Sequence, residues 1–199
     1  MEGVRTMSDT REHIIGLADE LIRKRGFNAF SYNDIAVPLA VRNAAIHYYF
    51  PSKSDLGEAV IDLELRKVEE YRRDSERLTG EEQLKLLVGI FRRNNKLRMI
   101  CLMGSLTPDY DTFEVPMRRK VKEMCLAVLD WVAGSLEKAR DEGKLQFEGA
   151  AGDRALLVIS TLLSSLLLSR VLGTNIFERM LDQLLQDMRA DWQVKDIKL

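Results

Sequence analysis

The side chains best suited to a specific chemical task lie between residues 43 and 48. Asn43 and His47 are four residues apart, and Ala44 and Tyr48 have the same spacing. Such spacing places the four side chains in two adjacent stripes on one side of a helix. In the major groove of DNA, asparagine can pair with adenine, an aromatic edge can meet a thymine methyl group, and alanine allows close approach. The pattern therefore predicts a helix that contacts base edges.

Neighbouring elements must hold this helix, and the sequence marks where they begin. Ile46 and Phe50 lie one turn apart on its other side and are expected to pack inward. Ser31 followed by Asp34 is a capping-box pattern, which predicts a short helix over about 32–39. A three-residue turn then leads into the base-contacting helix. Short helices joined by a tight turn are the layout of a helix-turn-helix unit.

The stretch from residue 26 to residue 56 resembles the DNA-binding domain of TetR/AcrR transcription regulators. The matching positions are Gly26, Phe27, Ser31, Ile35, Ala36, Val41, Ile46, Tyr49, Phe50, Ser52, Lys53 and Leu56. The resemblance implies an N-terminal helix-turn-helix and a helical body that binds a small-molecule effector. It also implies a homodimer on a near-palindromic operator in double-stranded DNA.

The resemblance also assigns DNA contacts to individual residues. Base contacts fall on Asn43, Ala44, Ala45 and Tyr48, with Arg42 at the helix entrance, and contacts with DNA phosphates fall on His47, Tyr49 and Lys53. Apart from the resemblance, the capped helix start at Ser31 and Tyr32 would offer free backbone N–H groups to phosphates. Simpler alternatives stand beside these: Tyr49 as a core residue, Arg42 as a solvated charge, and the alanines as good helix formers. Lys53 has the strongest argument, because a cation near a helix start is unfavourable unless an anion compensates.

Three residues depart from the family pattern. Ala40 replaces the glycine of the turn, which costs about 1 kcal/mol if the backbone is left-handed there. Pro38 falls where the second helix should still be hydrogen-bonded, so a kink or an early end is expected. His47 replaces a common tyrosine, and because histidine loses its charge near neutral pH, the affinity for DNA is expected to fall as pH rises through about 6 to 7.

Helical periodicity, capping pairs and glycine or proline breaks predict an all-α chain of about nine helices. The expected ranges are about 9–25, 32–39, 43–50, 53–78, 79–103, 115–141, 153–172 and 175–192. We expect residues 1–55 to form the DNA-binding domain, with a disordered lead at 1–8. Residues 56–199 are expected to form the ligand-binding and dimerisation domain.

Large flexible or aromatic side chains collect along the middle of the expected body. They are Phe91, Met99, Cys101, Met103, Tyr110, Phe113, Met117, Met124 and Trp131. Some are expected to line an apolar effector cavity, although each also fits an ordinary core. Cys101 has two interpretations: a buried structural cysteine, favoured by its apolar neighbours, or an effector-sensing thiol activated by Arg98.

The last two expected helices carry more apolar positions than a thin helical body needs. These positions are Leu156, Ile159, Leu163, Leu166, Leu167, Phe177, Leu181, Leu184 and Leu185. A four-helix bundle formed by two helices from each subunit across a twofold axis would bury them. The excess therefore predicts a homodimer.

Composition and motifs exclude several other classes of protein. Lys and Arg total 30 against 31 Asp and Glu, so a globally basic nucleic-acid coat is excluded. The isolated Cys101, Cys125, His13 and His47 give neither a disulfide framework nor a metal site. No Gly-rich phosphate loop or acid–base cluster is present, so we expect no cofactor and no enzyme activity.

One long apolar segment near the C-terminus resembles a membrane span in composition. Residues 155–169 are uncharged but shorter than the roughly 20 residues that cross a bilayer, so a buried packing helix is expected. The first ten residues contain no apolar h-region, which favours the cytoplasm.

The sequence thus predicts a ligand-responsive repressor released from its operator by a small apolar molecule. The competing hypothesis is a helical ligand-binding or protein-interaction module without DNA binding, with Pro38 and Ala40 as signs of decay.

Overall fold

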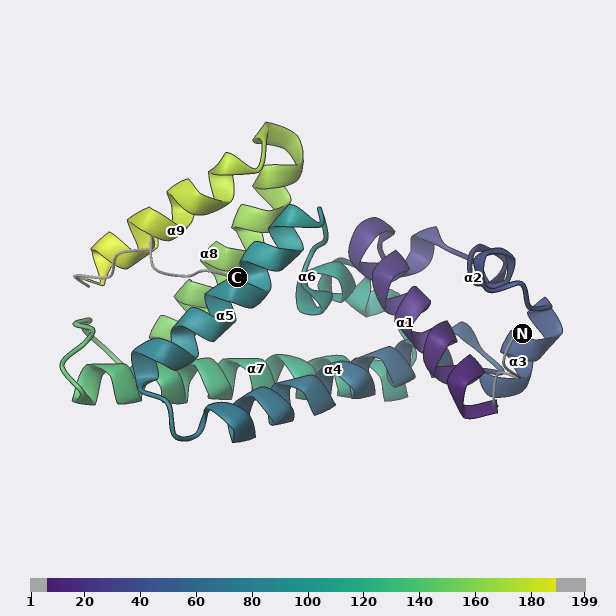
Figure 1. The fold of residues 1–199 in the computed structure, drawn as a ribbon, viewed down its shortest axis with the longest axis horizontal. Coiled ribbons are helices and arrows are strands. Elements are labelled where there is room, and N and C mark those ends of the chain that lie inside the picture. Colours follow the sequence, from purple (N-terminus) through teal and green to yellow (C-terminus); the bar gives the residue numbers. More distant parts are fainter. Residues whose placement is uncertain (1–6, 189–199) are drawn as a thin grey trace, which may run out of the picture. The chain divides into compact units, whose positions relative to one another are not determined.

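A computed structural model describes residues 7–188, and the described chain is helical with short connections (Figure 1). This range contains nine α-helices and two 3-10 helices, with no strand, which confirms the predicted fold class. The elements are α1 (Met7–Arg25), η1 (Phe27–Ala29), α2 (Tyr32–Leu39), α3 (Asn43–Tyr49), α4 (Lys53–Ser75), α5 (Gly80–Lys96), α6 (Leu102–Leu106), η2 (Thr107–Thr112), α7 (Val115–Asp141), α8 (Ala151–Leu172) and α9 (Asn175–Asp187).

The ends of the chain differ from the predicted helix limits. α1 begins at Met7, two residues earlier than expected, so the predicted lead is helical at its last two residues. α9 ends at Asp187 rather than continuing further. The remaining lead at 1–6 and the predicted last turn at 189–192 lie outside the described residues.

The predicted continuous helix over 79–103 is wrong, because the chain breaks between α5 and α6. Arg98 has a left-handed φ of 54°. The N–H groups of Arg98 and Met99 donate to the carbonyls of Asn95 and Asn94 at 3.0 and 2.9 Å, which closes a Schellman C-cap. Glycine usually occupies the left-handed position of this cap. Its replacement by arginine left no sequence signal for the break.

Packing divides the chain into two compact units. Among the described residues, unit 1 comprises 7–65 and 102–124, and unit 2 comprises 66–101 and 125–188. The division falls within α4 and α7, because each of these helices contributes residues to both units. The functional boundary expected after residue 55 is a separate matter and stays a prediction.

Unit 1 holds the three N-terminal helices around a small apolar core. Ile14, Ile35, Ile46 and Leu56, from α1, α2, α3 and α4, are all fully buried at 0% exposure. At Gly57 the packing is so close that an added Cβ would lie 2.7 Å from the Met117 side chain and 2.8 Å from that of Phe27. This core fixes α3 through its inner side.

Unit 2 is built on helices that pack along their length. α8 lies against α9, and α5 packs on α8 (Figure 1). Arg92 of α5 binds the Glu178 carboxylate of α9 with two hydrogen bonds of 2.7 and 2.8 Å. Inside the unit, the Ser135 hydroxyl donates to Gln83 at 2.8 Å, so this buried polar pair is satisfied.

Within residues 7–188, α8 alone is long and apolar enough to cross a membrane by length and composition. A core helix of a soluble protein passes the same test. Buried residues make up 39% of its most apolar window, so the helix packs on the protein along one side and leaves other apolar side chains exposed. The prediction of a buried packing helix is therefore correct for one side of α8 and does not explain the exposed apolar side chains.

Candidate nucleic-acid interface

The outer side of α3 is exposed in the pattern that the spacing predicts. Asn43, Ala44, His47 and Tyr48 are exposed, and Tyr48 retains 71% of its accessible surface. Ile46, on the inner side, is 0% exposed. The helix thus presents amide, methyl, imidazole and phenol groups to solvent from a rigid base. These are groups that can meet base edges in a major groove.

The remaining predicted residues of α3 lie at its margins. Arg42 is exposed at the N-cap position, where its extended backbone precedes the first turn. Ala45 is half-buried. Tyr49 is also half-buried, with its ring edge-on to Tyr48 at 5.2 Å between centroids. Tyr49 is therefore partly a core residue and partly accessible to solvent. Arg42 and Asn43 are accessible to a ligand.

A left-handed residue makes the turn between α2 and α3. Ala40 has φ 55° and ψ 39°, and the N–H of Val41 donates to the carbonyl of Ala36 at 3.0 Å. The backbone therefore adopts the conformation for which glycine is favoured, and the strain anticipated for Ala40 is present. Of the two effects expected of Pro38, the early end of α2 is wrong, because the helix continues to Leu39, and the kink stays a prediction.

Tyr32 ties the end of α3 to the start of α4. Its hydroxyl lies 2.9 Å from the Phe50 carbonyl and 2.6 Å from the Ser52 carbonyl, and its ring meets His47 edge-on at 4.7 Å. Burial, with a smaller effect from Asp55, raises the pKa of Tyr32 to about 12. The phenolic proton is therefore directed at protein carbonyls, so the geometry gives this predicted DNA contact a positioning role.

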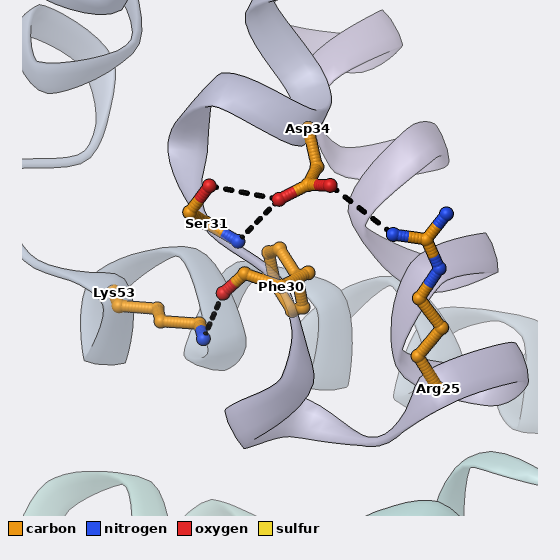
Figure 2. Close-up of polar contacts among 5 residues, drawn as sticks. All are labelled: Arg25, Phe30, Ser31, Asp34 and Lys53. Atoms are coloured by element: carbon orange, nitrogen blue, oxygen red, sulfur yellow. Dashed lines mark hydrogen bonds and ion pairs between the residues drawn. The ribbon is translucent and has the colours of Figure 1, made fainter.

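The start of α2 is fixed by a capping box (Figure 2). The backbone N–H and the hydroxyl of Ser31 both donate to the Asp34 carboxylate at 2.8 Å. Arg25 donates to the same carboxylate at 3.1 Å. The hydrogen bonds from Ser31, more than Arg25, lower the pKa of Asp34. Ser31 therefore caps the helix as predicted, and a phosphate contact there remains a prediction.

Lys53 is compensated within the protein rather than left for an anion. Its ammonium donates to the Phe30 carbonyl (Figure 2) and lies 4.2 Å from the centroid of the Phe30 ring and 5.0 Å from that of Phe27. Burial lowers the pKa of Lys53, and the nearby carboxylates of Asp109 and Asp34 oppose that shift. The argument that this cation requires an external anion therefore loses its force.

Arg11 is a basic residue near α3 that the sequence analysis missed. Its guanidinium lies 5.3 Å from the centroid of the Phe50 ring, and Phe50 caps the C-terminus of α3. The side chain is exposed. Helical periodicity places Arg11 on the polar side of α1, but only the folded packing brings it near α3.

The comparisons with known proteins agree with this geometry. Residues 14–60 match the family described as bacterial regulatory proteins, tetR family. A TetR-family transcriptional regulator from Agrobacterium tumefaciens is 25% identical, with 92% of this chain and 99% of that chain covered and a TM-score of 0.85. A TetR regulator from Legionella pneumophila is 27% identical over 94% of this chain and 99% of its own, with a TM-score of 0.79.

The chain is therefore similar to TetR-family transcriptional regulators, most specifically over residues 14–60. A curated relative, the HTH-type transcriptional repressor BepR of Brucella suis biovar 1, is 24% identical over 160 residues, which is 77% of each protein. The predicted resemblance is thereby confirmed. The DNA contacts assigned to single residues of this chain remain predictions.

The predicted effector residues of the regulator are divided between the two units. Phe91, Met99, Cys101 and Trp131 belong to unit 2, whereas Met103, Tyr110, Phe113, Met117 and Met124 belong to unit 1. Most of them are buried, including Cys101 at 8% exposure. Unit 2 contains a small apolar cavity, with room for about one water molecule, between α5, α7, α8 and α9, and Leu87, Val158 and Leu184 are in its wall. None of the predicted residues lines that cavity.

The residues predicted to form the dimer interface differ in their exposure. Six of the nine are buried within the chain: Ile159, Leu166, Phe177, Leu181, Leu184 and Leu185. They join α8 and α9 inside one subunit, so they are not available to a partner. Leu163 is half-buried, while Leu156 and Leu167 are exposed. The apolar band on the outer side of α8 consists of Leu156, Leu157, Leu167, Leu168, Val171 and Leu172, with exposures from 43% to 81%.

Proposed function

We propose that the regulator is a homodimeric, cytoplasmic repressor that binds a near-palindromic operator through α3 and leaves it when a small molecule binds. One observation supports the DNA contact above all others: the exposed side of α3 with Asn43, Ala44, His47 and Tyr48. Its inner side is buried, so these groups are held in a fixed orientation. The similar protein BepR is a transcriptional repressor, which supports repression over activation.

Binding to the DNA upstream of its own gene tests this proposal. Fluorescence anisotropy at fixed salt is expected to show tighter binding than to scrambled DNA, because base contacts add to the phosphate term. Asn43→Ala should cost about 1–3 kcal/mol on the preferred site and relax sequence preference. Asn28→Ala, at an exposed asparagine of η1, is the matched control and should retain both affinity and preference.

Two outcomes of this experiment contradict the proposal. Equal affinity for operator and scrambled DNA would favour the helical module without DNA binding. Equal losses in Asn43→Ala and Asn28→Ala would show that the outer side of α3 does not contact bases.

The apolar band on α8 supports the homodimer. Its six side chains recur along one side of the helix and are exposed to water in the single chain. Large exposed apolar patches mark interaction sites, and a twofold axis would place the same band against its copy. In such a dimer, recognition helices about 34–36 Å apart would meet successive major grooves.

The apolar cavity in unit 2 supports a small effector. Its walls are leucine and valine side chains with Met188, so a molecule bound there would be apolar, and the cavity would have to widen to admit it. We propose that the bound effector shifts α4, whose residues 53–65 belong to unit 1 and whose residues 66–75 belong to unit 2. The spacing of the recognition helices then changes and the operator is released. An effector that binds tightly while leaving operator affinity unchanged would refute this mechanism.

A further inference from the structure

One basic side chain of α1 lies beside the end of α3 and differs from the other cations of its helix. The Arg11 guanidinium lies over the ring of Phe50, the C-cap residue of α3, at 5.3 Å from the ring centroid. Arg11 is exposed, and it forms no ion pair with any residue in 7–188. The other three Lys and Arg residues of α1 each bind a carboxylate. Arg11 is therefore the cation of α1 that an external anion can reach.

Phe50 gives Arg11 a fixed base next to α3. Phe50 is 2% exposed, its N–H donates to the Ile46 carbonyl at 2.8 Å, and its carbonyl accepts from the Tyr32 hydroxyl at 2.9 Å. A guanidinium has five N–H donors, and contact with a ring leaves most of them free for hydrogen bonds. The donors of Arg11 are thus held near α3 and directed at solvent.

The two other basic residues around α3 define what Arg11 adds. Lys53 is half-buried, and its ammonium already donates to the Phe30 carbonyl. Arg42 is exposed at the N-cap of α3, so an exposed arginine lies at each end of this helix. Phosphates border the major groove on both strands, and arginine contacts to them fix the register of a helix that reads bases.

We propose that Arg11 binds a phosphate of the DNA backbone at the border of the major groove that α3 enters. This inference rests on the proposed DNA contact of α3 and assigns a further contact to the same interface. A guanidinium matches two phosphate oxygens, and such charge-assisted hydrogen bonds are among the strongest in proteins. The contact carries no sequence information. It positions α3, whereas Asn43 contributes the sequence preference.

The salt dependence of DNA binding tests the proposal. Fluorescence anisotropy is measured with the DNA upstream of the gene and with scrambled DNA of equal length, from about 50 to 200 mM KCl. Arg11→Gln should weaken binding roughly three- to tenfold on both DNAs. The slope of log affinity against log salt should become less steep by about 0.9 for each bound subunit, because one phosphate fewer is neutralised.

Two further variants separate a phosphate contact from a general effect of charge. Lys24→Gln is the matched control, because it removes the same charge from an exposed position at the opposite end of α1, and it should keep the slope. Arg11→Lys should restore the slope but not the full affinity, because it keeps the charge and loses the paired donors. An unchanged slope in Arg11→Gln would overturn the proposal, and so would an equal change in Lys24→Gln. A lower thermal midpoint with an unchanged slope would leave Arg11 as a stabiliser of the α3 end.

The outcomes also distinguish this inference from the proposed operator recognition. If Asn43→Ala loses sequence preference while Arg11→Gln keeps the slope, the base contact stands and the phosphate contact fails. If the chain binds both DNAs equally and Arg11→Gln still reduces the slope, the phosphate contact stands and operator recognition fails.

Discussion

Ala40 places an L-residue in a backbone conformation that favours glycine. Ala40→Gly is expected to raise the free energy of unfolding by about 0.5–1 kcal/mol, because relief of the left-handed strain exceeds the added entropy of the unfolded chain. The thermal midpoint should then rise by roughly 2–4 °C per kcal/mol for a chain of this size. Urea unfolding measures the change directly.

Ala44→Gly is the control for this substitution, since Ala44 is exposed within α3. It should lower the free energy of unfolding by about 1 kcal/mol, the ordinary cost of glycine in a helix. A loss of stability in Ala40→Gly comparable to that of the control would show that the turn is not strained.

Tyr32 is expected to make the free energy of unfolding decrease at alkaline pH. Its pKa is about 12 in the folded chain, against 10.0 for the ordinary side chain, because burial disfavours the phenolate. Above pH 10 the unfolded chain loses this proton first, so the contribution of Tyr32 falls as pH rises from about 10 to 12. Urea unfolding at pH 9 and pH 11 should show a smaller loss in Tyr32→Phe than in the unmodified chain. Identical losses would contradict the buried hydroxyl.

The direction in which single side chains point could be predicted from the sequence where helical periodicity alone determines it. The helical repeat places Asn43 and His47 outward and Ile46 inward, and the structure shows this arrangement. It did not foresee that Lys53 donates to the Phe30 carbonyl or that Tyr32 bridges two carbonyls. Such partners are 18 to 23 residues away along the chain, so only the closed fold brings them together.

At the scale of elements, the contact between α5 and α7 depends on one glycine. A Cβ at Gly80 would lie 2.2 Å from the Ala139 nitrogen and 2.5 Å from the Ser135 oxygen, both backbone atoms that cannot rotate away. Gly80→Ala is therefore expected to lower the free energy of unfolding by about 1–3 kcal/mol. Chemical denaturation provides the measurement.

The same helix offers a control of opposite sign. A Cβ at Gly89 meets no atom within 4 Å, so Gly89→Ala should stabilise the chain by about 0.5–1 kcal/mol through helix propensity. If the two variants shift stability in the same direction, the close approach of α5 to α7 is not as described.

Helix starts were more predictable than helix ends. The capping boxes at Ser31, Ser52 and Thr79 all form, because the pairing side chains are three residues apart and act locally. The end of α5 was missed because Arg98 holds the position of a glycine. The face of α9 was also misassigned: its apolar side packs on α8 in the same chain, and apolarity alone does not distinguish an internal partner from an external one.

For the whole molecule, the apolar band on α8 should determine the oligomeric state. Leu157→Asp combined with Val171→Asp is expected to convert the dimer into monomers, because two buried carboxylates per subunit would face their copies across the interface. Sedimentation equilibrium measures the change. Leu126→Asp alters a side chain of α7 that is 57% exposed and should leave the dimer intact. A dimer that survives the double substitution would place the interface elsewhere.

The band on α8 also connects the abundance of the protein to its resistance to unfolding. In the proposed homodimer, these six leucine and valine side chains are removed from water, so mass action would make the folded state more stable as the number of copies rises. The melting temperature should accordingly climb on concentration and drop on dilution. In a cell that makes few copies, a larger fraction of the protein would be monomeric and less stable. These monomers would be degraded by proteases faster than the dimers that predominate at high copy number.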